Sequence, residues 1–151
     1  DYVARFVENV GRGRIVTAAA IMRKNPVIVR LKKEGPEAII RKMREKNLFA
    51  LPVVGADGKF LGEISLKDVV NLRKQGIKEI DSVIVSEVPS VLETTTVEDM
   101  LTLLPKIKQA IPVVSEDNVL LGVVSPSSII IEMTGKDQNE IDKIIQNAID
   151  L

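Results

Sequence analysis

Two segments of the chain, sixty residues apart, have closely similar sequences. LPVVGADGKFLGEISLKDVV at 51–70 and IPVVSEDNVLLGVVSPSSII at 111–130 are identical at seven of twenty positions without a gap. Upstream, NPVIV at 25–29 aligns with VPSVL at 88–92 at an offset of 63. Such self-similarity indicates one supersecondary unit that occurs twice. A unit of about sixty residues with two or three strands buries too little surface to be stable alone, so we expect the copies to pack on each other.

Each copy predicts the same order of elements, namely a strand, an amphipathic helix, a PVV strand, a turn, a second strand and a closing helix. In the first copy Pro36 suits the first turn of a helix that ends near Asn47. The apolar face of this helix is expected to contain Ile39, Ile40 and Met43.

The second copy has its own start and stop signals. Thr96 and Asp99 resemble a capping box, and the helix that follows is expected to run until Pro105 stops it. The turns at 57–58 and 117–118 contain residues that tolerate a left-handed backbone, so each is expected to join a hairpin. The closing helices are predicted to begin at Ser65 and Ser125 and to end near Gly76 and Gly135.

Two further helical patterns flank the repeats, at residues 3–10 and 141–149. Apolar side chains recur in each at the spacing of an amphipathic helix. Each stripe needs a partner, which is either the core of the repeats, a second chain or a neighbouring domain.

The two halves of the chain carry opposite charge, although the whole is neutral. Residues 1–75 contain 16 basic and 8 acidic side chains, a balance of +8, whereas residues 76–151 contain 5 and 13, a balance of −8. This asymmetry favours self-association of unlike halves or an anionic ligand on the basic half, unless both halves are simply solvated. The chain has four aromatic residues, so no nucleic-acid partner is predicted, because single strands are recognised by stacking.

The composition excludes several kinds of enzyme. The chain contains no His and no Cys, which removes histidine-based triads, thiol nucleophiles and Cys/His zinc sites. No apolar stretch approaches the roughly 20 residues that span a bilayer. The chain begins with Asp1, and we expect it to be a piece of a longer protein. We therefore predict a non-catalytic part of a larger assembly.

The segments IM..NPV at 21–27, LPVV..DGKFLGEISLKD at 51–68 and IPVV..DNVLLGVVS at 111–125 resemble the cystathionine β-synthase (CBS) domain. The resemblance covers about residues 15–135. It implies an α/β fold, a tandem pair (Bateman module) of pseudo-symmetric β-α-β-β-α repeats with flanking helices. The implied division is a linker or helix at 1–14, a first repeat at 15–76, a second repeat at 77–135 and a C-terminal amphipathic helix at 136–151.

The ends of the chain, 1–22 and 134–151, resemble the ATP-binding subunits of osmoprotectant ABC importers for glycine betaine, carnitine and choline. No phosphate-binding G-x-x-x-x-G-K loop occurs in the chain itself. The resemblance therefore implies a regulatory region attached to an ATPase domain, acting indirectly on membrane subunits at the cytoplasmic face of a bacterial membrane. Family resemblance further implies a homodimer and adenine nucleotides bound in clefts between the repeats.

The family's ligand motif corresponds here to Gly62 through Asp68, in which Ser65 and Asp68 would contact ribose and phosphate. The same two residues equally suit a helix cap. In the second copy Ser125 is retained, but the carboxylate is replaced by Ser128. That cleft is expected to hold a ribose poorly, so a mononucleotide site would be single, or the ligand would be held across a dimer interface.

Purine contacts of the family map by position onto aliphatic and small residues, which equally suit core packing. They are Thr17, Ile28, Leu48, Ala50 and Pro52, with Ala110, Ile111 and Val123. No cofactor is required by this interpretation. The expected ligand is cyclic di-AMP, with AMP or ATP as alternatives. Two rival hypotheses remain, a dimer that responds to ionic strength through its unlike halves, and a structural dimerisation module without a ligand.

Overall fold

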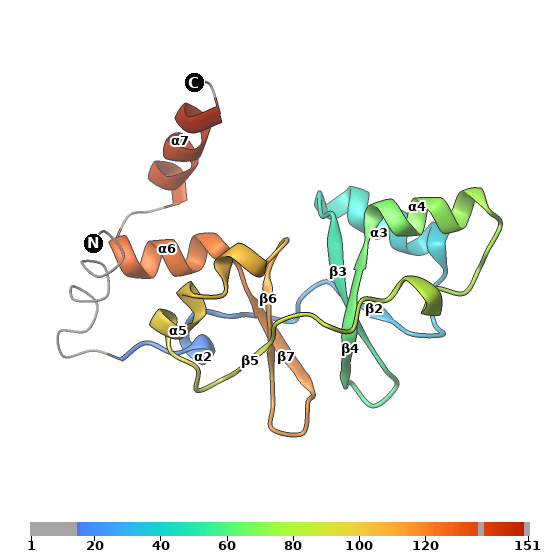
Figure 1. Ribbon diagram of the computed structural model, residues 1–151, viewed down its shortest axis with the longest axis horizontal. Coiled ribbons are helices and arrows are strands. Elements are labelled where there is room, and N and C mark those ends of the chain that lie inside the picture. The colour runs from blue at the N-terminus through green and yellow to red at the C-terminus, as the bar shows by residue number, and fades with distance from the viewer. Residues whose placement is uncertain (1–14, 136–137, 150–151) are drawn as a thin grey trace.

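The computed structural model describes residues 15–135 and 138–149 and contains two similar α/β units (Figure 1). The first unit consists of β2 (Val29–Arg30), α3 (Pro36–Lys46), β3 (Ala50–Val54), β4 (Phe60–Ser65) and α4 (Leu66–Lys74). The second consists of β5 (Val91–Leu92), α5 (Val97–Leu101), β6 (Ile111–Val114), β7 (Leu120–Val124) and α6 (Pro126–Thr134). The predicted order of elements is confirmed in both copies.

Shorter elements precede, join and follow the two units. They are α2 (Ala18–Ile21), β1 (Arg23–Lys24), the 3₁₀ turns η1 (Asp81–Val83) and η2 (Leu104–Lys106), and α7 (Gln138–Ile149). The helix predicted at residues 3–10 lies outside the described residues. Helix α7 coincides with the predicted C-terminal helix, and Ile149 near its end is 70% exposed. None of the described helices is long and apolar enough to cross a membrane.

Both sheets are built alike. In the first unit β2 is parallel to β3 and β3 is antiparallel to β4, in the order β2-β3-β4. In the second unit β5, β6 and β7 repeat this arrangement. The register places Val53 opposite Gly62 and Val113 opposite Gly122, and each hairpin has an irregularity one residue later. The internal repeat is therefore present in strand register as well as in sequence.

The two units exchange their starting segments. Strand β1, which precedes the first unit, pairs antiparallel with β7 of the second unit, with Arg23 opposite Val123. The segment that precedes the second unit does the reverse, because Val85 bridges Glu63 of β4 through two hydrogen bonds of 2.9 Å. The sheet of each unit is thus extended by the segment that precedes the other unit in the sequence.

The same exchange completes the two hydrophobic cores. Val16 and Ala18, which lie before the first unit, are buried in the core of the second unit. Ile80, which lies before the second unit, is buried in the core of the first. Neither repeat could keep its core intact if it were separated from the other, so the pair forms one folding unit.

Local signals in the sequence are mostly realised as predicted. The hydroxyl oxygens of Ser65, Thr96 and Ser125 each accept a hydrogen bond of 3.2 Å from the backbone N–H three residues later. On α3, the predicted apolar face is buried. Gly58 and Asn118 have positive φ angles, of 82° and 66°, in the two hairpin turns.

Helix α5 is shorter than predicted. It ends at Leu101, and the chain continues as the 3₁₀ turn η2 instead of reaching Pro105 as a helix. Pro105 has no N–H to donate, and its ring would clash with the carbonyl of Leu101 in a continued α-helix. The effect of proline therefore extends back over the preceding turn.

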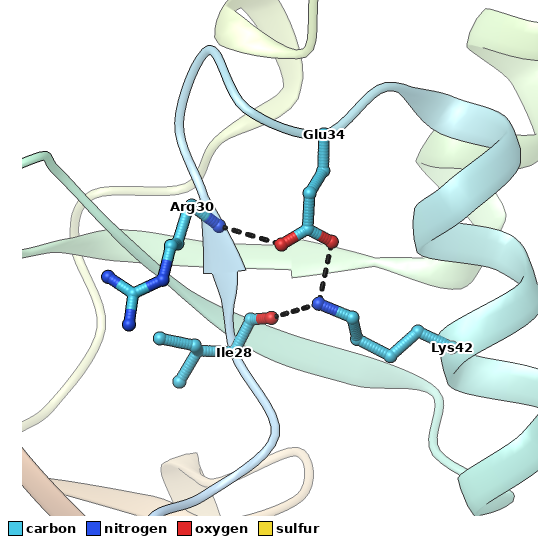
Figure 2. Close-up of polar contacts among 4 residues, drawn as sticks. All are labelled: Ile28, Arg30, Glu34 and Lys42. Atoms are coloured by element: carbon cyan, nitrogen blue, oxygen red, sulfur yellow. Dashed lines mark hydrogen bonds and ion pairs between the residues drawn. The ribbon is translucent and has the colours of Figure 1, made fainter.

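A polar cluster fixes the entry to the first sheet (Figure 2). The Lys42 ammonium on α3 donates to the Ile28 carbonyl at 2.7 Å and to Oε2 of Glu34 at 2.6 Å. Oε1 of Glu34 accepts a hydrogen bond from the Arg30 backbone at 3.3 Å. These contacts tie helix α3 to strand β2 through groups that are partly buried, where charged hydrogen bonds contribute more than at the surface.

Candidate ligand clefts between the two repeats

Two cavities lie between the repeats. Each is lined by the last strand of one repeat, β4 or β7, and by segments of the chain that lie outside that repeat's sheet. The Asp68 cavity has a volume of about 90 Å³ and involves β4, the start of α4, and segments 85–89 and 106–110. Its lining residues are Glu63, Ser65, Asp68, Val85, Glu87, Val88, Pro89, Lys106, Ile107, Lys108 and Ala110.

The second cavity is larger. The Ser128 cavity has a volume of about 260 Å³ and involves β7, the start of α6, and segments 21–27 and 48–52. Its lining residues are Ile21, Met22, Arg23, Pro26, Val27, Leu48, Ala50, Leu51, Pro52, Gln109, Ala110, Val123, Ser125 and Ser128. Ala110 lines both cavities, so the two spaces adjoin there.

The two cavities are equivalent under the internal repeat. An offset of sixty residues places Ser65 on Ser125 and Asp68 on Ser128. By the same offset, Leu48 of the Ser128 cavity corresponds to Lys108 of the Asp68 cavity, and Val123 corresponds to Glu63. One cleft therefore contains a pair of opposite charges at positions where the other contains two aliphatic side chains.

The predicted site residues do not form one site. Ser65, Asp68 and Ala110 line the Asp68 cavity. A second group lines the Ser128 cavity, and its members are Leu48, Ala50, Pro52, Val123 and Ser125, together with Ala110. The structure therefore divides these eight predicted residues between two related cavities.

Three predicted residues lie apart from both cavities. Ile111 is fully buried in the core of the second repeat, as the alternative interpretation proposed. Thr17 precedes α2 and bridges Thr96. The carbonyl of Ile28 accepts a hydrogen bond from Lys42 (Figure 2), and Ile28 lines a separate hollow together with residues of both hairpins, such as Gly58 and Leu121.

Charged groups from both repeats face the Asp68 cavity. They are Glu63, Asp68 and Glu87, with Lys106 and Lys108. Burial raises the pKa of the Glu63 carboxyl from its usual value of 4.5, and the positive charge of Lys108 partly opposes this. The backbone N–H of Asp68 is bound by Ser65, which confirms the capping role of Ser65. Within residues 15–135 and 138–149, no hydrogen bond or ion pair engages the Asp68 carboxylate.

The Ser128 cavity has a different polarity. Arg23 is its one charged lining residue among those described, and its remaining polar side chains are Gln109, Ser125 and Ser128. The hydroxyl oxygens of Ser125 and Ser128 lie 2.8 Å apart. The Gln109 side-chain oxygen accepts hydrogen bonds from the backbone of Phe49 at 2.9 Å and of Ala50 at 3.0 Å. Gln109 therefore fixes the rim of this cavity from the opposite repeat.

Several lining residues were missed by the sequence reasoning, although a signal for some of them existed. Applying the sixty-residue offset to the predicted contacts Leu48 and Val123 leads directly to Lys108 and Glu63. Arg23 had no such signal, because it reaches the cavity through the exchange of β1 onto the second sheet. Among the described residues, no group of three or more carboxylates is arranged to hold a metal ion.

The fold and the paired clefts define a class of protein in which two β-α-β-β-α repeats interlock and enclose two related cavities. Residues 18–74 and 77–135 each match the CBS domain, and the chain belongs to the CBS domain family. CBS domain pairs are in general regulatory and not catalytic.

Curated relatives are ATP-binding subunits of transporters. The chain is 30% identical over 141 residues to the glycine betaine/carnitine transport ATP-binding protein GbuA of Listeria monocytogenes, covering 92% of this chain and 34% of that protein. It is 25% identical over 138 residues to the glycine betaine transport ATP-binding protein OpuAA of Bacillus subtilis, covering 91% and 32%. The chain thus spans about a third of the length of these relatives.

Solved structures share the fold at lower identity. The CBS domain pair of MJ0100, in complex with 5′-methylthioadenosine and S-adenosyl-L-methionine, has a TM-score of 0.66 at 22% identity, covering 82% of this chain and 100% of that one. CBSX2 in complex with AMP has a TM-score of 0.65 at 21% identity, covering 76% and 93%. OpuCA of Staphylococcus aureus has a TM-score of 0.63 at 19% identity, covering 73% and 92%.

Proposed function

We propose that this chain is a regulatory module that binds an adenine nucleotide and thereby controls the ATPase of an osmoprotectant importer. The observation that carries the proposal is the Asp68 carboxylate, which lines a cleft between the repeats and is engaged by no other described group. Cyclic di-AMP is the nucleotide that we favour for the module as a whole. AMP and ATP are the alternatives.

The chemistry of the Asp68 cavity suits a nucleotide. A carboxylate is an acceptor that can bind both hydroxyls of a ribose. Lys106 and Lys108 supply positive charge for phosphate, and Val85 and Ile107 supply apolar surface for a base. One structural neighbour is a complex with AMP, and another is a complex with 5′-methylthioadenosine and S-adenosyl-L-methionine, which supports an adenine ligand.

The size of the cavity suggests how binding would become a signal. Cavities that enclose small molecules usually measure about 300–1,000 Å³, and the Asp68 cavity measures about 90 Å³. A nucleotide therefore enters this cavity by widening it, which moves segments of the two repeats relative to each other. A ligand that binds the wider state more tightly shifts the population toward it.

The resemblance to importer subunits supports the assignment of partners. The module would follow an ATPase domain in the same chain, form a homodimer and act on the membrane subunits through that ATPase. Its location would be the cytoplasm, at the inner face of the bacterial membrane. The two curated relatives are named as ATP-binding proteins of glycine betaine transport, which supports this context.

The test is thermal unfolding of the chain with AMP, ATP and cyclic di-AMP. A ligand at a hundred times its Kd adds about 2.7 kcal/mol of stability, which raises the Tm by several degrees. Asp68→Ala should abolish the shift given by AMP. Asp99→Ala is the matched control, because Asp99 occupies the same position after the Thr96 cap but lines neither cavity.

The outcomes separate the hypotheses. If both variants keep the AMP shift, Asp68 serves only the helix start. If no nucleotide stabilises the chain while a dimer persists, the module is a structural scaffold.

The opposite charges of the two halves favour one alternative, a dimer that responds to ionic strength. Attraction between a half with +8 and a half with −8 weakens as the Debye length shrinks to about 8 Å near physiological salt. Sedimentation at several salt concentrations tests this alternative, since a dimer constant that is independent of salt excludes it.

A further inference from the structure

The two cavities offer different hydrogen-bonding groups at equivalent positions. Asp68 presents a carboxylate, which only accepts hydrogen bonds, whereas Ser128 presents a hydroxyl, which can donate. The Ser125 hydroxyl lies 2.8 Å from that of Ser128 and 3.1 Å from that of Ser127, and either member of each pair can be the donor. The Ser128 hydroxyl is therefore able to donate to a ligand oxygen, which the Asp68 carboxylate is not. The second repeat therefore offers a neutral hydroxyl that can donate at the position where the first repeat offers a carboxylate that only accepts.

The formal charges of the two cavities also differ, and the Ser128 cavity is the more positive. The Asp68 cavity is lined by three acidic and two basic side chains, so its formal charge is −1. The Ser128 cavity is lined by Arg23 as its one charged side chain, so its formal charge is +1. Arg23 lies on β1, opposite Val123, and thus belongs to the wall of the cavity rather than to a distant patch.

A ribose with two free hydroxyls needs acceptors, whereas a ribose whose 3′ oxygen carries phosphate needs donors and positive charge. A carboxylate beside that phosphate would repel it, while a guanidinium and a hydroxyl can both donate to it. The Ser128 cavity is also close to the lower limit of about 300 Å³ for small-molecule sites, at about 260 Å³. Its apolar wall, with Met22, Leu48 and Val123, suits the face of an adenine.

We propose, on the basis of the function proposed above, that the two cavities take different esters of adenosine. The Ser128 cavity binds an adenosine whose 3′ oxygen is esterified to phosphate, as in a 3′,5′-cyclic dinucleotide. The Asp68 cavity binds an adenosine whose 2′ and 3′ hydroxyls are both free, as in 5′-AMP. Ser128 and Asp68 are the residues that determine this specificity.

Calorimetric titration of the chain with 5′-AMP, 3′-AMP and cyclic di-AMP tests the proposal, because the two monophosphates differ only in the position of phosphate. Ser128→Asp should weaken cyclic di-AMP and 3′-AMP at least tenfold and leave 5′-AMP unchanged. Asp68→Ala should do the reverse. Ser128→Asn is the matched control, because asparagine has nearly the size of aspartate without its charge and can still donate a hydrogen bond, so this variant should keep the binding of cyclic di-AMP and 3′-AMP.

Folding of the variants is checked by circular dichroism, and Ser128→Asp should fold because an acidic residue in the first turn of a helix is favourable. The proposal is overturned if Ser128→Asp leaves cyclic di-AMP and 3′-AMP binding intact, if Asp68→Ala weakens them, or if 5′-AMP alone binds the natural chain. In those three cases nucleotide sensing itself still stands. If none of the three nucleotides binds while ATP still stabilises the chain, this inference fails alone. If ATP gives no stabilisation either, the proposed function fails with it.

Discussion

Substitution of Gly62 by alanine should destabilise the chain through the contact that joins the two repeats. Gly62 has a φ of 148°, and a Cβ atom there would lie 2.3 Å from the carbonyl oxygen of Val85. Strain at such a backbone angle costs about 1–3 kcal/mol. The clash also displaces the segment that forms two hydrogen bonds between Glu63 and Val85, each contributing about 1 kcal/mol. The expected loss is therefore about 3–5 kcal/mol.

Gly76→Ala provides a matched control for this substitution. Gly76 also has a positive φ, of 72°, but a Cβ atom there would meet nothing within 4 Å. The control variant should lose only the conformational cost of about 1–2 kcal/mol. Each kcal/mol lowers the Tm by about 2–4 °C in a domain of this size, so Gly62→Ala should lower it by roughly 10 °C and Gly76→Ala by a few degrees. Equal shifts in the two variants, measured by circular dichroism, would refute the clash with Val85.

Two further changes test the interface between the repeats. Gln109→Leu leaves the backbone N–H groups of Phe49 and Ala50 without their acceptor, and should cost about 1–3 kcal/mol in urea unfolding with an unchanged slope. Because the pKa of Glu63 is raised in the folded state, the folded chain holds its proton at pH values where the unfolded chain has lost it. Stability should therefore fall as the pH rises above 4.5, and this dependence should be weaker in Glu63→Gln.

Local features of the fold were predictable because each depends on neighbouring residues. The cap at Thr96 needs a hydroxyl followed by a free N–H three residues later, and both are visible in the sequence. The buried face of α3 follows from the spacing of Ile39, Ile40 and Met43. The hairpin turns follow from residues that tolerate a positive φ, such as Gly58.

The exchange of starting segments was not predictable in the same way. Strand β1 contains two residues, both exposed, and so has no periodic pattern. Its partner β7 lies about a hundred residues further along the chain. The pairing of β1 depends on the folded second repeat. The backbone of Arg23 approaches Gly122 of β7 closely, and this approach is possible because glycine has no side chain.

The candidate clefts were predictable only in part, and the internal repeat explains why. A duplicated unit places equivalent residues on equivalent walls, so a contact inferred in one copy predicts a contact sixty residues away in the other. Where the copies agree, as at Ser65 and Ser125, the shared residue caps a helix in both. Where the copies differ, two charged residues appear in one cleft. The Asp68 cavity has Lys108 and Glu63 at the positions where the Ser128 cavity has Leu48 and Val123. A charge introduced alone into a partly buried cleft is costly, and a charge of opposite sign on the facing repeat offsets that cost. The places where the copies differ are therefore the places where the two clefts can differ in ligand.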